Sequence, residues 1–213
     1  MSQPTLAPRA YVYIDGFNLY YGIRNTPYKW LNVAALCQLL LPGYDIQQIR
    51  YFTAKVKSRP QDPDQHVRQR TYLRALESLP NLTIVYGHFL SHPVRMPEHP
   101  ITNLVKRVWV MKTEEKGSDV NLAAYLLDDA HRNQFDVAAV ISNDSDLVMP
   151  IRMARTLGKT VGVLIPPTAT PSQHLARETD FFKPIRGGVL RASQFPSVVT
   201  ATNGTPLHKP SGW

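Results

Sequence analysis

The sequence predicts an α/β fold, in which a mostly parallel sheet is covered by helices on both faces. Stretches rich in β-branched and aromatic residues alternate with helical apolar patterns along most of the 213 residues. This alternation is typical of parallel strands that are joined by crossover helices. The stretch 135–141 is also almost continuously apolar, as strands are when both faces of a sheet are covered.

The expected strands and helices follow one another in chain order. Strands are predicted at 11–15, 46–56, 82–90, 135–141 and 160–165, with a short extra strand at 107–112. Helices are predicted at 31–41, 65–79, 119–132, 147–157 and 173–178, and several of them stop at a proline or glycine. The segment 92–100 contains three prolines and no regular apolar spacing, so we expect a loop there.

The chain is expected to form one domain over residues 10–190, between a flexible N-terminus at 1–9 and a flexible polar C-terminal tail at 191–213. The longest apolar run, at 33–41, is too short to span a membrane, and residues 1–9 show no secretory signal. The single cysteine, Cys37, excludes an internal disulfide. We therefore expect a cytoplasmic protein with no membrane partner.

The chain is strongly basic. Its formal net charge is +8 and its isoelectric point is near 9.7. Such a charge attracts anionic partners over long range, and nucleic acid is the commonest of them. A basic protein without such a partner remains the simple alternative.

Acidic and amide side chains are placed where strands end or helices begin. Asp15 ends the first strand and Asn18 comes three residues later, Asp144 and Asp146 follow the strand at 135–141, and Asp119 opens a long helix. Because ligands bind outside the carboxyl ends of parallel strands, these side chains are expected to converge at one edge of the sheet. Each of them has a simpler interpretation as a helix cap or a turn residue.

A convergence of carboxylates indicates a bound cation. Like charges at short distance repel one another, and a hard divalent ion such as Mg²⁺ or Mn²⁺ removes that cost. The same ion can activate a water molecule and neutralise charge on a phosphodiester. A basic surface around an acidic metal pocket is the charge pattern of a nuclease.

Four sequence blocks resemble the NYN domain family, and in particular the LabA-like branch of the PIN-like nuclease superfamily. The resemblance covers roughly residues 10–165, and the blocks occur in the family's order at 14–18, 115–123, 142–147 and 158–161. It implies a PIN-like three-layer α/β/α sandwich with about five central strands and a metal-dependent ribonuclease activity. On that pattern the metal-binding acids are Asp15, Asp119 and Asp144, Asn18 is their polar partner, and Asp146 is an auxiliary catalytic acid.

Contacts to the substrate are predicted on either side of these acids. Lys55, Lys112 and Lys116 lie in or near segments that are expected to border the site and could contact phosphates, as could Lys57 and Arg59. Ser142 and Asn143 belong to the same block as Asp144 and are assigned to substrate binding with it. Three tyrosines could stack on unpaired bases or simply pack in the core: Tyr20, Tyr21 and Tyr28.

Three functions are therefore compared. The first is a metal-dependent endoribonuclease. The second is a catalytically weak or inactive NYN-like module that binds RNA or a protein partner, because Tyr125 stands where many relatives carry a further acid. The third, a phosphohydrolase of the haloacid dehalogenase type, is disfavoured because Phe17 occupies the place of its second aspartate. A homodimer stays open in each case.

Overall fold

The computed structural model describes residues 6–99, 106–167 and 170–213. At its centre is a six-stranded sheet with the order β3-β2-β1-β6-β7-β8, in which all neighbours pair in parallel. Its strands are β1 (Arg9–Asp15), β2 (Asp45–Thr53), β3 (Leu82–Tyr86), β6 (Val137–Ile141), β7 (Thr160–Ile165) and β8 (Phe181–Pro184). The predicted parallel sheet is confirmed, and β8 is the strand that extends it beyond the expected five.

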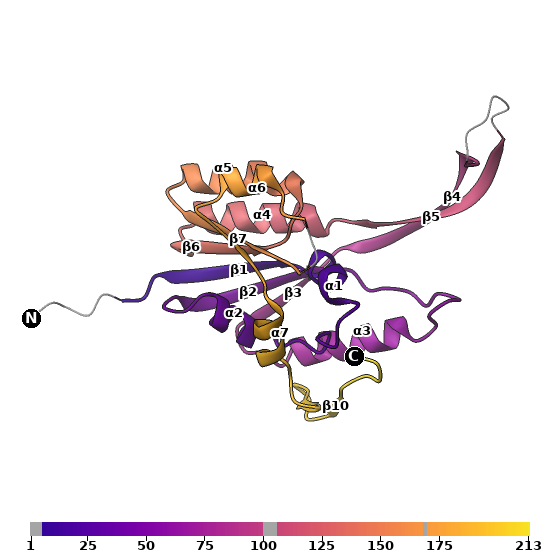
Figure 1. Ribbon diagram of the computed structural model, residues 1–213, viewed down its shortest axis with the longest axis horizontal. Coiled ribbons are helices and arrows are strands. Elements are labelled where there is room, and N and C mark those ends of the chain that lie inside the picture. The colour runs from indigo at the N-terminus through magenta and orange to yellow at the C-terminus, as the bar shows by residue number, and fades with distance from the viewer. Residues whose placement is uncertain (1–5, 100–105, 168–169) are drawn as a thin grey trace, which may run out of the picture.

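Helices form a layer on each face of this sheet, which gives a PIN-like three-layer α/β/α sandwich (Figure 1). One layer contains α4 (Ser118–His131), α5 (Val148–Thr156) and α6 (Gln173–Glu178), and a 3-10 turn, η1 (Ser145–Leu147), leads into α5. The other layer contains α1 (Gly16–Ile23), α2 (Val33–Leu40), α3 (Gln65–Leu76) and α7 (Gly187–Ala192). None of the helices among the described residues is long and apolar enough to cross a bilayer.

Alternation along β1 divides the buried side chains between two cores. Val12 and Ile14 point into the core under α1, α2 and α3, whereas Tyr13 points into the core under α4 and α5. Successive side chains of a strand point to opposite faces, so a central strand must be apolar throughout. Cys37 of α2 is fully buried in the first core.

An ion pair between a partly buried arginine and a buried aspartate anchors α4 on the sheet. Arg50 of β2 donates two hydrogen bonds of 2.8 Å to the carboxylate of Asp129, and the hydroxyl of Tyr13 donates a third of 2.8 Å. The guanidinium of Arg50 also lies 4.5 Å from the ring centre of Tyr125. Tyr125, which stands where the resemblance leads us to expect a further acid, therefore stacks on this ion pair.

A two-stranded antiparallel arm projects from the body between β3 and α4 (Figure 1). It consists of β4 (His88–Pro97) and β5 (Arg107–Lys116). The predicted extra strand is confirmed as part of β5, but the predicted loop at 92–100 was wrong over residues 92–97. Pro93 and Pro97 are tolerated because β4 has an open outer edge, where a missing backbone N–H costs no ladder bond. Residue 100 lies outside the described residues.

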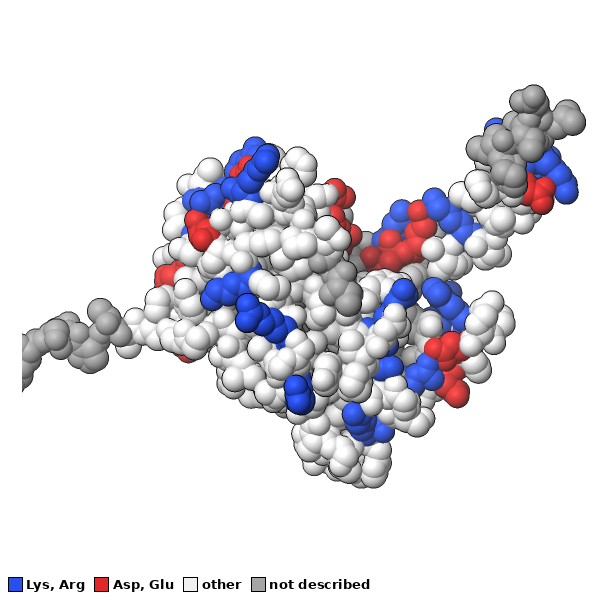
Figure 2. All heavy atoms as spheres, viewed as in Figure 1, with Lys and Arg blue, Asp and Glu red and all other residues white. Residues whose placement is uncertain are grey.

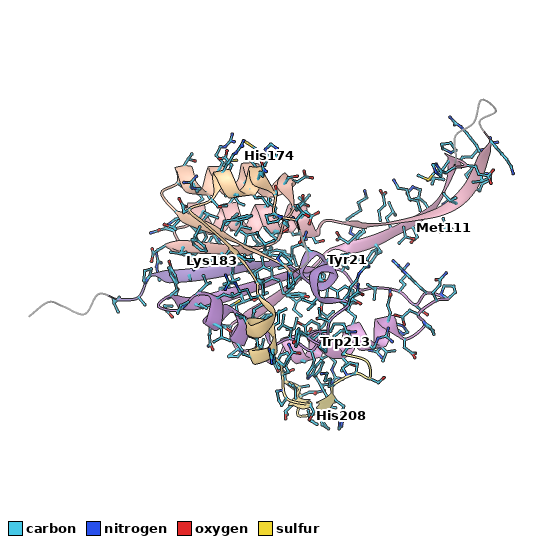
Figure 3. All side chains as sticks on the ribbon, viewed as in Figure 1. Tyr21, Met111, His174, Lys183, His208 and Trp213 are labelled. Atoms are coloured by element: carbon cyan, nitrogen blue, oxygen red, sulfur yellow. The ribbon has the colours of Figure 1, made fainter. Side chains whose placement is uncertain are left out.

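The segment 191–213, expected to be a flexible polar tail, is packed against the body. It forms β9 (Val198–Thr200) and β10 (Pro206–His208), an antiparallel pair in which Val199 and Leu207 are buried. Trp213 lies beside α3 (Figure 3), and its ring centre is 5.5 Å from that of Tyr72. A few apolar residues spaced along a polar segment suffice here because each inserts against the same core. The expected flexible N-terminus falls largely outside the described residues.

The Arg50–Asp129 pair generates a stability prediction. Asp129→Ala is expected to lower the free energy of unfolding by about 3–5 kcal/mol, because Arg50 and Tyr13 lose a buried partner. The measurement is urea denaturation followed by circular dichroism. Asp128→Ala is the matched control: Asp128 is exposed and pairs with Arg132 on the same helix, so a change within about 0.5 kcal/mol is expected. Equal losses in both variants would contradict the anchoring role of Asp129.

Candidate functional site

The candidate site lies where the order of the strands reverses. The chain runs from β1 outward to β3 on one side, and β6, β7 and β8 follow on the other side of β1. Ile14 of β1 is opposite Ile141 of β6, so Asp15 and Ser142 are the next residues of two neighbouring strands. Such a switch point leaves a crevice at the carboxyl edge of a parallel sheet, which is where ligands bind.

Asp15 is buried at this edge and held by two hydrogen bonds. The N–H of Asn18 donates to its Oδ1 at 2.9 Å, which caps the start of α1, and Ser142 Oγ donates to its Oδ2 at 3.1 Å. Asp15 is only 5% exposed. Burial raises the pKa of Asp15 to about 6, the charges of Asp119 and Asp144 add to the rise, and the two hydrogen bonds oppose it.

Gly16 allows α1 to begin directly after this carboxylate. A Cβ atom at Gly16 would lie 2.6 Å from the ring of Tyr51 and 2.7 Å from the carbonyl oxygen of Phe52. Any larger residue would push α1 away from β2. The glycine in the first motif is therefore required by close packing.

The loop after β6 is tied to the first motif. The N–H of Asn143 donates to Oδ1 of Asn18 at 3.2 Å, and the N–H of Asp144 donates to Ser142 Oγ at 3.1 Å. Asp144 in turn caps the turn η1 by accepting from the N–H of Asp146 at 3.0 Å. These hydrogen bonds, all made by residues close to the ends of β1 and β6, place Asp144 beside Asp15.

Ser142 and Asn143, predicted to contact the substrate, already have partners within the protein. Ser142 bridges Asp15 and Asp144, as described. The side chain of Asn143 donates to the carbonyl of Thr170 at 2.7 Å and accepts from the N–H of Ser172 at 2.9 Å. Both residues thus shape the loop, and their role in substrate binding stays a prediction.

The start of α4 brings Asp119 to the same edge. Gly117 precedes the helix with a left-handed φ of 99°, and Glu115 Oε1 accepts from the N–H of Ser118 at 3.2 Å. Asp119 sits in the first turn, and its pKa is raised by partial burial and then by the charges of Asp144, Glu115 and Asp146. Asp15, Asp119 and Asp144 line one cavity.

The acids have the donor chemistry of a hard cation but not the spacing of a closed site. Carboxylate oxygens from Asp15, Asp119 and Asp144 are the ligands that Mg²⁺ and Mn²⁺ prefer. Within the described ranges, however, no three His, Cys, Asp or Glu side chains are grouped closely enough to hold a metal ion. The donor set fits such an ion, while its geometry is open.

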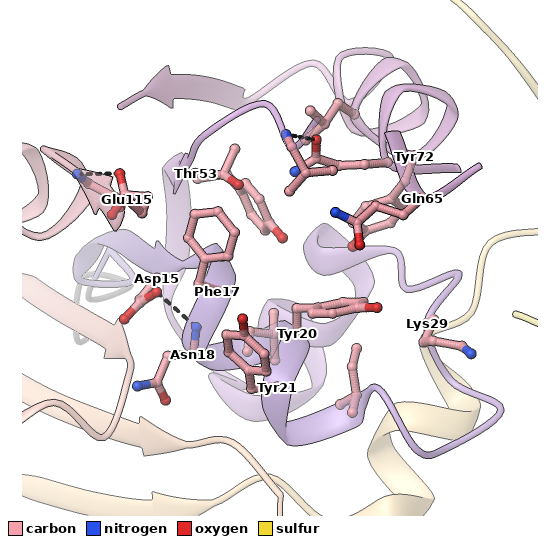
Figure 4. A pocket seen from close by; sticks show the side chains of 18 of the residues that line it. Asp15, Phe17, Asn18, Tyr20, Tyr21, Lys29, Thr53, Gln65, Tyr72 and Glu115 are labelled. Carbon is pink, nitrogen blue, oxygen red and sulfur yellow. Dashed lines mark hydrogen bonds between the residues drawn. The ribbon is translucent and has the colours of Figure 1, made fainter. Parts of the chain in front are cut away.

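A cavity of about 420 Å³ opens beside these acids (Figure 4). Its lining includes Asp15, Asn18, Asp119, Asp144 and Glu115. Asp146, the predicted auxiliary acid, is exposed and lies outside the lining, although its charge reaches Asp119. The structure therefore brings together four of the five predicted catalytic residues around one cavity.

Of the predicted phosphate-binding residues, Arg59 lines this cavity, whereas the four lysines lie outside its lining. Lys112 and Lys116 form ion pairs with Glu114 at 2.7 and 3.4 Å. Because side chains alternate along β5, they point to the opposite face of the arm from Thr113 and Glu115, which do line the cavity. Lys55 lies over the ring of Tyr86, 4.9 Å from its centre.

Apart from Arg59, the residues of the far wall of the cavity were not anticipated. Five residues of α3 line it at the spacing of a single helical stripe: Gln65, Arg68, Gln69, Tyr72 and Leu73. Lys29, Arg59 and Trp213 also line it. The sequence does show a stripe of polar residues beside a tyrosine at 65–72, but it does not show which surface this stripe faces. Of the three tyrosines considered for stacking, Tyr20 and Tyr21 line the cavity, whereas Tyr28 packs against the core.

The buried charge of Asp15 generates a second prediction. Because folding raises the pKa of Asp15, its protonated carboxyl group adds to the free energy of unfolding. This contribution is complete below about pH 4 and is lost as the pH rises through about 6. Without metal, Asp15→Asn is expected to raise the free energy of unfolding at pH 8 by about 1–3 kcal/mol, because a pKa shift of one unit corresponds to about 1.4 kcal/mol.

The measurement is denaturation at several pH values in EDTA. The gain from Asp15→Asn should shrink as the pH falls from 8 to 5, since the wild type then takes up the proton. Asp45→Asn is the control, because Asp45 is exposed and its Oδ2 accepts from the nearby side chain of Gln47. A gain that did not vary with pH would show that charge at Asp15 is not its cause.

Comparison with known proteins agrees with this architecture. Residues 9–186 match the NYN domain. The chain is 31% identical to the 6-hydroxy-3-succinoylpyridine 3-monooxygenase of Pseudomonas putida, in a match that covers 96% of this chain and 75% of the relative. It also resembles the crystal structure of a protein of unknown function from Vibrio parahaemolyticus, with a TM-score of 0.58 and 16% identity over 87% of this chain and 98% of that one, a likeness of fold alone. With its acids at the carboxyl edge of a PIN-like sheet and a match across most of its length, the chain belongs to the NYN domain family.

Proposed function

We propose that the protein is a metal-dependent ribonuclease that hydrolyses RNA phosphodiester bonds. The observation that carries the proposal is the convergence of Asp15, Asp119 and Asp144, from three separate segments, on one cavity. Burial and mutual repulsion raise the pKa of Asp15 and Asp119, so these carboxylates would gain most from a cation. A nuclease-type fold supports the same proposal.

Each residue would have a distinct part in the reaction. Asp15, Asp119 and Asp144 would hold Mg²⁺ or Mn²⁺, which when bound supplies charge neutralisation and a more acidic water. Asn18 holds the loop that carries Asp144, through the N–H of Asn143. Asp146 acts at longer range, by its charge on Asp119.

The arm supports RNA as the substrate and partner. In β5 and β4, Arg107, Trp109 and Arg95 lie on the same face as the cavity-lining Thr113 and Glu115. Trp109 is 70% exposed, and an exposed aromatic ring between arginines can stack on a base while the cations contact phosphates. Figure 2 shows Lys and Arg side chains along the arm and below it, with carboxylates near its base. We place this activity in the cytoplasm.

The nuclease proposal predicts metal-dependent cleavage of RNA. With Mn²⁺ the wild type should cleave generic single-stranded RNA, and Asp15→Asn and Asp144→Ala should each lower the rate by about 100-fold or more, because an electrostatic contact to the transition state is lost. Gel analysis of labelled RNA measures the rate. Asp128→Asn removes the same charge from the exposed side of α4 and should leave the rate unchanged. Cleavage that survives in both site variants would refute the assigned site.

A non-cutting module that binds RNA or a protein is the alternative form of this proposal. Tyr125 stacks on Arg50 instead of supplying a further acid, and the carboxylates are openly spaced. In this form the wild type would bind RNA with a salt-dependent affinity but would show no cleavage with Mn²⁺ or Mg²⁺. The same gel and a filter-binding assay separate the two forms.

The relative from Pseudomonas putida favours a second candidate, oxidation of a small aromatic acid. That protein is named for a monooxygenase reaction on a hydroxylated succinoylpyridine, and the match spans nearly the whole of this chain. Such a reaction places one atom of O₂ on the ring and reduces the other to water, so it requires a two-electron donor. Incubating the protein with 6-hydroxy-3-succinoylpyridine, air and NADH, followed by chromatography, should then show a hydroxylated product. Recovery of 6-hydroxy-3-succinoylpyridine without any hydroxylated product would refute this candidate function.

A further inference from the structure

The cavity beside Asp15 has walls of opposite charge. Figure 4 shows Asp15 and Glu115 on one side, with Gln65 and Lys29 on the other. Gln65 begins the stripe of α3 that also includes Arg68, so the basic wall is built by α3 and the segment around Lys29. The acids account for a cation and a reacting phosphate, but they leave the basic wall without a role.

Cations on that wall exceed the carboxylates that neutralise them. Arg68 pairs with Asp62, whose side chain is partly exposed. Among the described residues, no carboxylate forms an ion pair with Lys29 or Arg59. The wall therefore attracts an anionic group, and an Arg or Lys within reach of a carboxylate or phosphate forms strong hydrogen bonds.

The space between the two walls is aromatic. Phe17 and Tyr20 of α1, Tyr51 of β2 and Tyr72 of α3 all face it. Phe17 is fixed by an edge-on contact with Phe89, whose ring centre is 5.7 Å away. Flat rings held in this way select flat ligands, because aromatic pairs stack or meet edge to face.

The polar residues of α3 keep the wall in place. Gln69 accepts from the N–H of Val56 at 2.9 Å and donates to the carbonyl of Ala54 at 2.9 Å. The hydroxyl of Tyr72 donates to the carbonyl of Leu31 at 2.8 Å. The cavity is thus largely preformed, and its volume of about 420 Å³ suits one ring with a short side arm.

We propose that this cavity binds a planar aromatic heterocycle that carries an anionic group. The ring lies between α1 and α3, and the anion lies at Lys29, Arg59 and Arg68. Two sources share this chemistry: a nucleotide of RNA, with its base in the cavity and a flanking phosphate on the basic wall, or a small aromatic acid. For RNA the inference rests on the proposed nuclease function, and for a small acid it does not.

The test is calorimetric titration of the full chain in EDTA, so that no metal takes part. The probes are uridine 5′-monophosphate and 6-hydroxy-3-succinoylpyridine. Their halves are uridine and 2-hydroxypyridine, which lack the anion, and phosphate and succinate, which lack the ring. At least one complete probe should bind about tenfold or more tightly than either of its halves, and the tighter probe identifies the source. If neither complete probe exceeds its halves, the inference is overturned.

Variants place the anion. Lys29→Gln and Arg68→Gln should each weaken the tighter probe by about tenfold or more, because one charged contact is lost. Arg70→Gln is the matched control, since Arg70 is on the exposed side of the same helix and outside the cavity. Equal affinities in all three variants would overturn the placement. The titration contains no metal and does not depend on catalysis. If the probes bind as expected but the protein with Mn²⁺ does not cleave RNA, the nuclease proposal is refuted and the binding inference stands.

Discussion

The hydrogen bond from Ser142 to Asp15 joins the ends of β1 and β6, and the whole candidate site is built around it. Parallel pairing makes the two residues neighbours, and the bond helps to compensate a carboxylate that is almost fully buried. Asn18 then connects this pair to the loop that carries Asp144. These hydrogen bonds hold a cluster of carboxylates together, and the folded protein tolerates the repulsion between them.

A second constraint fixes the direction of α4. The Arg50–Asp129 pair holds its C-terminal half on the sheet, and Gly117 with Glu115 sets its first turn. Asp119 is thus placed by a helix that is anchored at both ends. The arm enters the body at the same point, so Thr113 and Glu115 join the cavity while the rest of β5 stays outside.

Local sequence was sufficient wherever the backbone alone decides the position of a side chain. Asp15, Asp119 and Asp144 follow a strand end or open a helix, and the cavity contains all three. Sequence was not sufficient for Lys112 and Lys116, because the alternation of β5 and the nearby Glu114 decide where they point. Likewise, a helix was predicted at 65–79 and α3 ends three residues earlier, but which of its faces lines the cavity depends on packing between distant segments. Ordered packing of residues 191–213 rests on a few buried side chains such as Val199 and Leu207, which a polar composition hides.

The burial of Cys37 has a practical consequence. Its thiol is fully enclosed in α2, and burial raises its pKa to about 12, so it offers almost no reactive thiolate near neutral pH. As this is the sole cysteine in the sequence, the rate of its alkylation reports how often the core around α2 opens. A cysteine introduced at Met111, which Figure 3 places out on the arm, could then carry a fluorophore or spin label while the native thiol stays silent.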